Sequence, residues 1–210
     1  MKKTIFVFKN APKSVRTAGI VALILAVIAI LIPVIGANNA INGPLLKIPV
    51  IELLADEMDL DDMTAEIEEV LEWLEENEQT MSAEDFAEFE DEYGMSVQDF
   101  KKLMDLDSLS LSTMGTVMAS LAAGSGEEET VSLVFSVLTG VIGGFAGLLA
   151  LFVALSALFM NKGWFITAVV LAPGFFLTFI GAVWYVVFLG LCIAFCILTS
   201  KVKKAYKAFK

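Results

Sequence analysis

The sequence predicts an all-α integral membrane protein with four transmembrane helices and an acidic helical extracytoplasmic domain inserted between spans 1 and 2. The chain is 57% hydrophobic with a mean hydropathy of +0.76, which is too apolar for an ordinary soluble domain. All 25 acidic residues lie between Glu52 and Glu129, whereas most Lys and Arg residues lie near the two ends. Because Lys and Arg concentrate in the cytoplasmic flanks of spans, this segregation predicts that both termini are cytoplasmic.

The first predicted span covers residues 18–37 and follows a basic cytoplasmic N-terminus, residues 1–17. An uncharged apolar stretch of this length crosses a hydrocarbon core of about 30 Å. The alternative is a cleaved signal peptide, whose apolar core usually has only about 7–15 residues. Ala37 and Ala40 also offer a poor small-x-small cleavage site, so we expect the span to be retained.

Small residues recur in the first two predicted spans at alternating spacings of three and four. In the first span this seam is Gly19, Ala22, Ala26, Ala29, Pro33 and Gly36. In the second span, residues 131–160, it is Ser136, Gly140, Gly143, Gly147, Ala150, Ala154 and Ala157. Small residues let helix backbones approach closely in lipid, so we expect the two spans to pack through these seams. The GxxxG pairs Gly140/Gly144 and Gly143/Gly147 make a homo-oligomer contact the alternative.

The segment between these spans, residues 38–130, is too long for a plain loop and is predicted to form short helices. Thr64, Ser82 and Ser96 each follow a Met and precede an acidic or amide side chain, as helix N-caps do. Gly94 is predicted to end a helix. Apolar stripes with helical spacing are expected to close into one core. They are Ile67, Val70, Leu71 and Leu74; Phe86, Phe89 and Tyr93; Val97, Phe100, Leu103 and Met104; and Leu111, Met114, Val117, Met118 and Leu121.

The C-terminal part is predicted to hold two short spans, residues 164–181 and 182–200, because one helix over the whole stretch would be about 55 Å long. A single span with a re-entrant segment is the alternative. A cytoplasmic turn at residues 161–163 and a basic cytoplasmic tail at residues 201–210 complete the chain. Two cytoplasmic termini require an even number of spans, and we expect the plasma membrane as the location.

The densest run of carboxylates is the one candidate metal site, formed by Asp56, Asp59, Asp61 and Asp62. Carboxylate oxygens bind Ca²⁺ and Mg²⁺, so a loosely bound divalent cation is one interpretation and a solvated acidic face is the other. No other cofactor is expected. The chain has no His, and its two cysteines, Cys192 and Cys196, are expected to be packing residues. No familiar set of catalytic residues occurs, so we do not expect an enzyme.

The function expected from these features is binding. The acidic domain is predicted to contact a basic protein partner or cations, as an accessory, scaffold or sensor would. Its charge repels nucleic acid, which is therefore not expected as a partner, whereas the lipid bilayer is. The alternatives are a channel or transporter component with a small-residue-lined helix bundle, and protection against cationic membrane-active peptides. Spans without charged residues weigh against a self-sufficient transporter.

Overall fold

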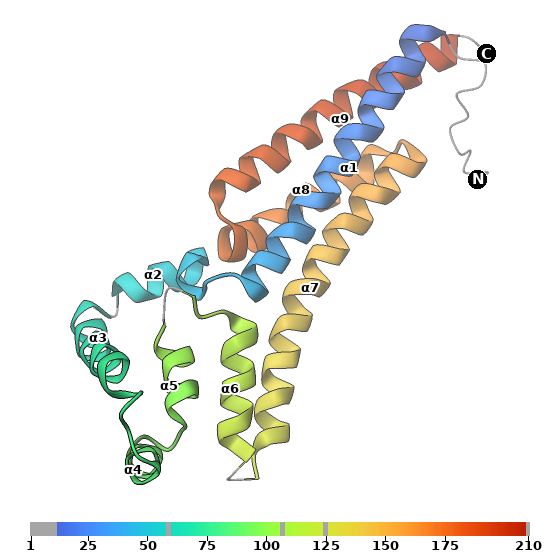
Figure 1. Cartoon of the computed structure of the whole chain (residues 1–210). Coiled ribbons are helices and arrows are strands. Elements are labelled where there is room, and N and C mark those ends of the chain that lie inside the picture. The colour runs from blue at the N-terminus through green and yellow to red at the C-terminus, as the bar shows by residue number, and fades with distance from the viewer. Residues whose placement is uncertain (1–11, 58–59, 106–107, 124–125, 209–210) are drawn as a thin grey trace. The chain divides into compact units, whose positions relative to one another are not determined.

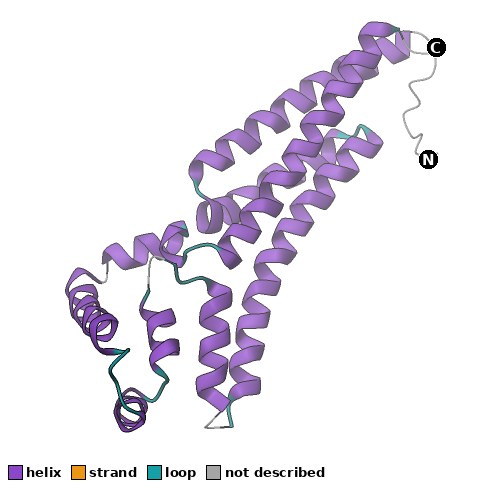
Figure 2. Cartoon of the chain, viewed as in Figure 1, coloured by secondary structure: helices purple, strands orange, loops and turns teal. Residues whose placement is uncertain are grey.

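The computed structural model describes residues 12–57, 60–105, 108–123 and 126–208, and these residues are almost wholly helical (Figure 2). The elements, labelled in Figure 1, are α1 (Lys13–Asn42), η1 (Leu45–Lys47), α2 (Pro49–Glu57), α3 (Leu60–Asn77), α4 (Ala83–Tyr93), α5 (Val97–Met104), α6 (Leu111–Ala123), α7 (Glu128–Phe159), α8 (Lys162–Phe175), η2 (Phe176–Ile180) and α9 (Ala182–Ala208). No strand occurs in these ranges beyond a single bridge between Pro44 and Ser110. The all-α prediction is confirmed.

Four of the described helices are long and apolar enough to cross a membrane, as the sequence predicts. They are Lys13–Asn42, Glu128–Phe159, Lys162–Ile180 and Ala182–Ala205. Helix α1 extends beyond the predicted span, residues 18–37, at both ends. At the C-terminal end it continues to Asn42, because Gly43 is the first helix-breaking residue after the predicted span. The long apolar C-terminal stretch is broken at Gly181, which has a positive φ of 108°. Glycine reaches this backbone conformation without steric cost, so it can join two helices at a sharp turn.

The chain divides into two compact units, one formed by Met1–Asn38 with Ile142–Lys210 and the other by Asn39–Val141. We call them unit 1 and unit 2. Helices α1 and α7 contribute residues to both.

Within unit 1, helix α1 buries its small side chains and exposes its large ones. All the seam residues of the first span are buried, from Gly19 to Gly36. On the other faces Ile24, Val27 and Ile35 are each more than half exposed. A water-soluble helix has the opposite arrangement, because exposure of large apolar side chains to water is unfavourable. In lipid that penalty disappears and close backbone approach determines which face packs.

One such close approach joins α1 to the C-terminal helices. A Cβ atom added at Gly36 would lie only 2.8 Å from Cγ1 of Ile180, in η2. Real Cβ atoms do not approach a neighbour so closely, so a larger residue at position 36 would force the Ile180 side chain to move. The seam of α1 is therefore a packing surface at this end.

Helices α8 and α9 form an antiparallel pair that is held together by aromatic contacts. The rings of Phe165 and Phe195 stack with centroids 4.4 Å apart, and those of Phe176 and Phe188 lie 5.1 Å apart. Between these contacts Pro173 lies inside α8, and the π-helical segment η2 follows it. Proline removes one helical hydrogen bond, and π-helical turns are a common way to absorb such a disruption.

Helix α7 buries a different face from the one that the seam predicts. Its buried residues in unit 1 include Ile142, Ala146, Leu149 and Val153. The predicted seam residues Ser136, Gly140, Gly143 and Gly147 are exposed, Ala150 and Ala154 are half-buried, and Ala157 is buried. A Cβ at any of the four glycines of α7 would meet no atom within 4 Å in the described chain. The packed face of α7 mixes large and small side chains and includes none of its four glycines, and the GxxxG homo-oligomer stays a prediction.

Unit 2 has a small core where three of the predicted stripes meet. Leu74 of α3, Phe89 of α4, and Val97 and Phe100 of α5 are buried together. Partly buried side chains surround them, namely Val70, Leu71, Met81, Met95 and Met104.

The predicted ends of these short helices are mostly confirmed. Ser82 and Ser96 cap α4 and α5, and Gly94 ends α4 in the left-handed conformation. The predicted start at Thr64 is wrong, because α3 already begins at Leu60.

The close contact at Gly36 generates a prediction. Gly36→Ala should destabilise the protein by about 1–3 kcal/mol, because the added methyl overpacks against Ile180. The second substitution Ile180→Ala should remove that clash, so the double variant should be more stable than the sum of the two single effects predicts. Thermal unfolding of the full-length protein in detergent measures this.

Gly144→Ala is the matched control, since no atom lies within 4 Å of its added methyl. A loss of stability at Gly144 as large as that at Gly36 would contradict the packing described here, as would purely additive effects of Gly36→Ala and Ile180→Ala.

Candidate functional site

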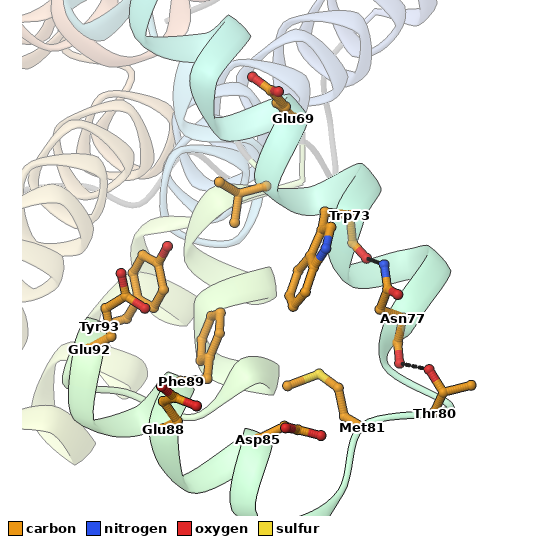
Figure 3. A pocket seen from close by; sticks show the side chains of 11 residues that line it. Glu69, Trp73, Asn77, Thr80, Met81, Asp85, Glu88, Phe89, Glu92 and Tyr93 are labelled. Carbon is orange, nitrogen blue, oxygen red and sulfur yellow. Dashed lines mark hydrogen bonds between the residues drawn. The ribbon is translucent and has the colours of Figure 1, made fainter.

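One hollow in unit 2 is a groove of about 670 Å³ between α3 and α4. Figure 3 shows the side chains that line it. Helix α3 contributes one face, with residues spaced as i, i+1, i+4 and i+8, and α4 contributes a face spaced as i, i+3, i+4, i+7 and i+8. The lining residues are Glu69, Val70, Trp73 and Asn77 from α3, Thr80 and Met81 from the connection, and Asp85, Glu88, Phe89, Glu92 and Tyr93 from α4.

The apolar part of this groove is aromatic. Trp73 projects from α3 toward the side chains of α4 and remains 51% exposed, so half of its surface is available to a ligand. Phe89 and Tyr93 stack with ring centroids 4.5 Å apart. Phe100 of α5 meets both rings edge-on from the core, at 5.4 and 5.2 Å. The groove therefore presents rigid aromatic surface that is continuous with the core of unit 2.

The polar part of the groove is anionic. Carboxylates of Glu69, Asp85, Glu88 and Glu92 line it, and none of its lining residues is basic. Two lysines of unit 2 pair with acids elsewhere: Lys101 with Glu78, and Lys102 with Asp99 at 3.1 Å. Neither of these two lysines is therefore paired with a carboxylate of the groove.

Local hydrogen bonds hold the two walls of the groove. At the end of α3, Nδ2 of Asn77 donates to the carbonyl oxygen of Trp73 at 2.8 Å, and Oγ1 of Thr80 donates to the carbonyl oxygen of Asn77 at 2.8 Å (Figure 3). At the start of α4, the Ser82 amide donates to Oδ2 of Asp85 at 2.6 Å, and the Asp85 amide donates to Oγ of Ser82 at 3.2 Å. This reciprocal capping box fixes the first turn of α4 at the mouth of the groove.

The pKa of the Asp85 carboxyl is lowered, chiefly by the hydrogen bond from the Ser82 amide and secondarily by the Ser82 hydroxyl. Hydrogen bonds to the charged form of a carboxyl group stabilise that form. Asp85 therefore stays ionised and contributes negative charge to the groove even in mildly acidic solution.

The structure leaves the predicted metal cluster untested. Asp59, like the side chains of Asp56, Asp61 and Asp62, lies outside what the structure describes. Among the described residues no group of three or more acidic or cysteine side chains is arranged to hold a metal ion.

The groove was not predicted from the sequence, because aromatic residues and acidic residues were considered separately. Phe89 and Tyr93 belong to a predicted apolar stripe, and the neighbouring acids of α4 were given no part in a site. The spacing of these residues could have predicted the groove. Asp85, Glu88 and Glu92 lie on the same face of α4 as the rings of Phe89 and Tyr93.

In its described part the chain is thus helical, with four helices capable of crossing a membrane and an aromatic, anionic groove outside these four helices. Comparisons of the chain with protein-family models, with curated proteins and with solved structures find no match.

The capping box generates a pH prediction. Asp85 should titrate below the ordinary aspartate pKa of about 3.9. Because folding lowers the pKa of Asp85, its ionised carboxylate stabilises the folded protein fully at pH values above the ordinary pKa. This stabilisation is lost as the pH falls through the lower pKa of the folded protein. Carboxyl carbon NMR shifts of the full-length protein in micelles measure the titration.

Ser82→Ala should raise the pKa of Asp85 only part of the way to the ordinary value, since the amide of residue 82 still donates. Ser96→Ala, which removes the equivalent cap of α5, is the control and should leave Asp85 unchanged. Titration of Asp85 at or above the ordinary value would contradict the capping geometry.

Proposed function

We propose that this protein is a multi-pass membrane protein that acts by binding, and that its groove between α3 and α4 receives a cationic side chain from a basic protein partner. It would serve as an accessory, scaffold or sensor. The observation that supports this most directly is the combination of one half-exposed tryptophan, Trp73, with four carboxylates in one groove.

The chemistry of the groove suits a cation better than any other ligand class. The face of an aromatic ring attracts a Lys or Arg cation electrostatically, and tryptophan does so most strongly. Carboxylates such as Glu88 and Glu92 add charge-assisted hydrogen bonds to a guanidinium or ammonium group. An anionic ligand would meet repulsion from every charged residue that lines the groove.

The size of the groove also supports this proposal. A volume of about 670 Å³ lies within the common range of ligand sites, about 300–1,000 Å³, and accommodates one long basic side chain with part of its backbone. The surrounding acidic surface of unit 2 would increase the rate of encounter with a basic partner.

The proposal includes a topology. Lys and Arg flank the ends of the predicted spans and acids fill the segment between the first two, so we place both termini in the cytoplasm and unit 2 outside. In the plasma membrane the groove would then face the exterior. The spans themselves hold no charged residue between Val131 and Ser200 except Lys162, so we assign the activity to unit 2.

Binding of an arginine-rich nonapeptide to the full-length protein in nanodiscs tests the proposal by calorimetry. Trp73→Ala should weaken binding about fivefold, the effect of losing a cation–π contact of roughly 1 kcal/mol. Trp73→Phe should retain most of the affinity because an aromatic face remains. Glu88→Gln should weaken binding about two- to fivefold through loss of one exposed charge pair.

Glu90→Gln is the matched control, because Glu90 is also an exposed acid of α4 but does not line the groove. If Glu90→Gln and Glu88→Gln weaken binding equally, the peptide recognises only bulk charge and the groove has no role. Absence of peptide binding at low salt would overturn the proposal outright.

A further inference from the structure

A second hollow lies in unit 1, between α8 and α9, and has a different character. It is a trough of about 520 Å³ with an almost wholly apolar lining. Figure 1 shows the two helices that form it. Its rims include Ile166 and Val170 on α8 and Ile193 and Ile197 on α9, all of them residues with exposed side chains.

Small side chains on α9 line part of the trough. Cys192, Cys196 and Ser200 follow one another at intervals of four and therefore lie on one helical face. Both cysteines of the chain line this trough, and both are free thiols. Between the larger residues of the rims, this row of small residues leaves the space that makes the hollow.

One end of the trough is basic. Lys162, at the first position of α8, and Lys201 and Lys204, near the end of α9, all line it. Because the helices are antiparallel, residues distant in sequence meet at the same end. Lys203 belongs to the same basic stretch but does not line the trough.

The backbone adds to this positive end. Helix α8 begins here, with Oδ1 of Asn161 accepting from the Gly163 amide at 3.1 Å as its N-cap. The N-terminal end of a helix carries partial positive charge and favours anions. An anion at this end would therefore interact with three ammonium groups and with the helix dipole.

We propose that the trough binds one anionic phospholipid, with its phosphate at Lys162, Lys201 and Lys204 and an acyl chain along the apolar wall between α8 and α9. This site is separate from the groove of unit 2 and does not depend on the function proposed for it. Basic pockets between spanning helices on the cytoplasmic side are suited to anionic lipid headgroups.

The dimensions favour a lipid over a free phosphate. Val170 lies eight residues beyond Lys162 along α8, about 12 Å, and Leu189 lies twelve residues before Lys201 along α9, about 18 Å. A small anion would occupy the basic end alone and leave this apolar length empty. A phospholipid fills both parts, because its headgroup and chain are joined.

Native mass spectrometry of the full-length protein tests the proposal, with phosphatidylglycerol and phosphatidylcholine as probes in separate mixtures. The protein should retain phosphatidylglycerol in clear preference to phosphatidylcholine. Lys162→Gln and Lys204→Gln should each reduce phosphatidylglycerol retention about fivefold, the effect of one basic residue at an anionic headgroup. Lys203→Gln, which removes an equal charge beside the trough, should reduce it less than twofold.

Further measurements distinguish binding of a whole phospholipid from binding of a free headgroup. They also distinguish binding in the trough from binding to the basic C-terminal tail. Cys196→Leu adds volume to the trough lining without changing charge and should lower phosphatidylglycerol retention. Glycerol 1-phosphate should fail to displace the bound lipid. A phosphatidylglycerol with a photoreactive group at its chain end should crosslink to α8 or α9 near Val170 or Leu189.

Specific outcomes would overturn the assignment. Equal retention of the two lipids, or an equal loss with Lys203→Gln and Lys204→Gln, would show that the basic tail acts only as a diffuse charge. Displacement by glycerol 1-phosphate would show that the basic end binds free phosphate esters. Crosslinks confined to other helices would place the chain elsewhere. Circular dichroism and elution as a single species confirm that each variant is folded, and the exposed lysines make this the expected result.

Discussion

An apolar solvent is the physical constraint on which the rest of this structure depends. Helix α1 buries Ala22, Ala26 and Ala29 completely or nearly so, and exposes isoleucines and valines along its other faces. That arrangement would be unstable in water. In lipid that exposure is not penalised, and small residues let neighbouring helices pack closely, as where the Ile180 side chain packs against Gly36. The aromatic contacts between α8 and α9 follow the same rule, since large rings there fill the space between helices.

The same solvent explains why charge is so unevenly distributed. The four helices that can cross a membrane have few charged residues, so acids and bases are confined to the segments between and beyond them. In unit 2 many acids have local roles: Asp85 and Asp99 interact with the N-cap serines of α4 and α5, and Glu78 pairs with Lys101. Three further carboxylates of the groove, those of Glu69, Glu88 and Glu92, lie beside its aromatic surface. In unit 1 the lysines at the ends of two helices converge on one trough.

Helix caps, long apolar helices and core positions could be predicted from the sequence, because each has a short and specific sequence pattern. Ser82 and Ser96 start α4 and α5 as predicted, and Gly94 ends α4, because capping depends only on nearby backbone groups. The four long apolar helices and the stripes that form the core of unit 2 followed from periodicity. The seam of α1 is buried throughout, since nearly all of its small residues lie on one face.

The remaining features depend on which helix faces meet, and periodicity does not specify that. Glycines are so frequent in α7 that a seam could be drawn on its exposed face, while Ile142 and Leu149 form the packed one. The predicted start of α3 at Thr64 is late, since residues 60–63 are already helical. The groove and the trough each combine two helices. Only their pairing places Trp73 opposite the carboxylates of α4, and Lys162 beside Lys201 and Lys204.

We propose a topology in which unit 2 faces the exterior and both termini lie in the cytoplasm. Cysteine accessibility tests it most directly, in a background where Cys192→Ala and Cys196→Ala remove the native thiols. Glu88→Cys reports on the groove and Lys203→Cys on the basic end. In intact cells a membrane-impermeant maleimide should label the first and should label the second only after permeabilisation. Labelling of both from the same side, or in the reverse order, would contradict the account.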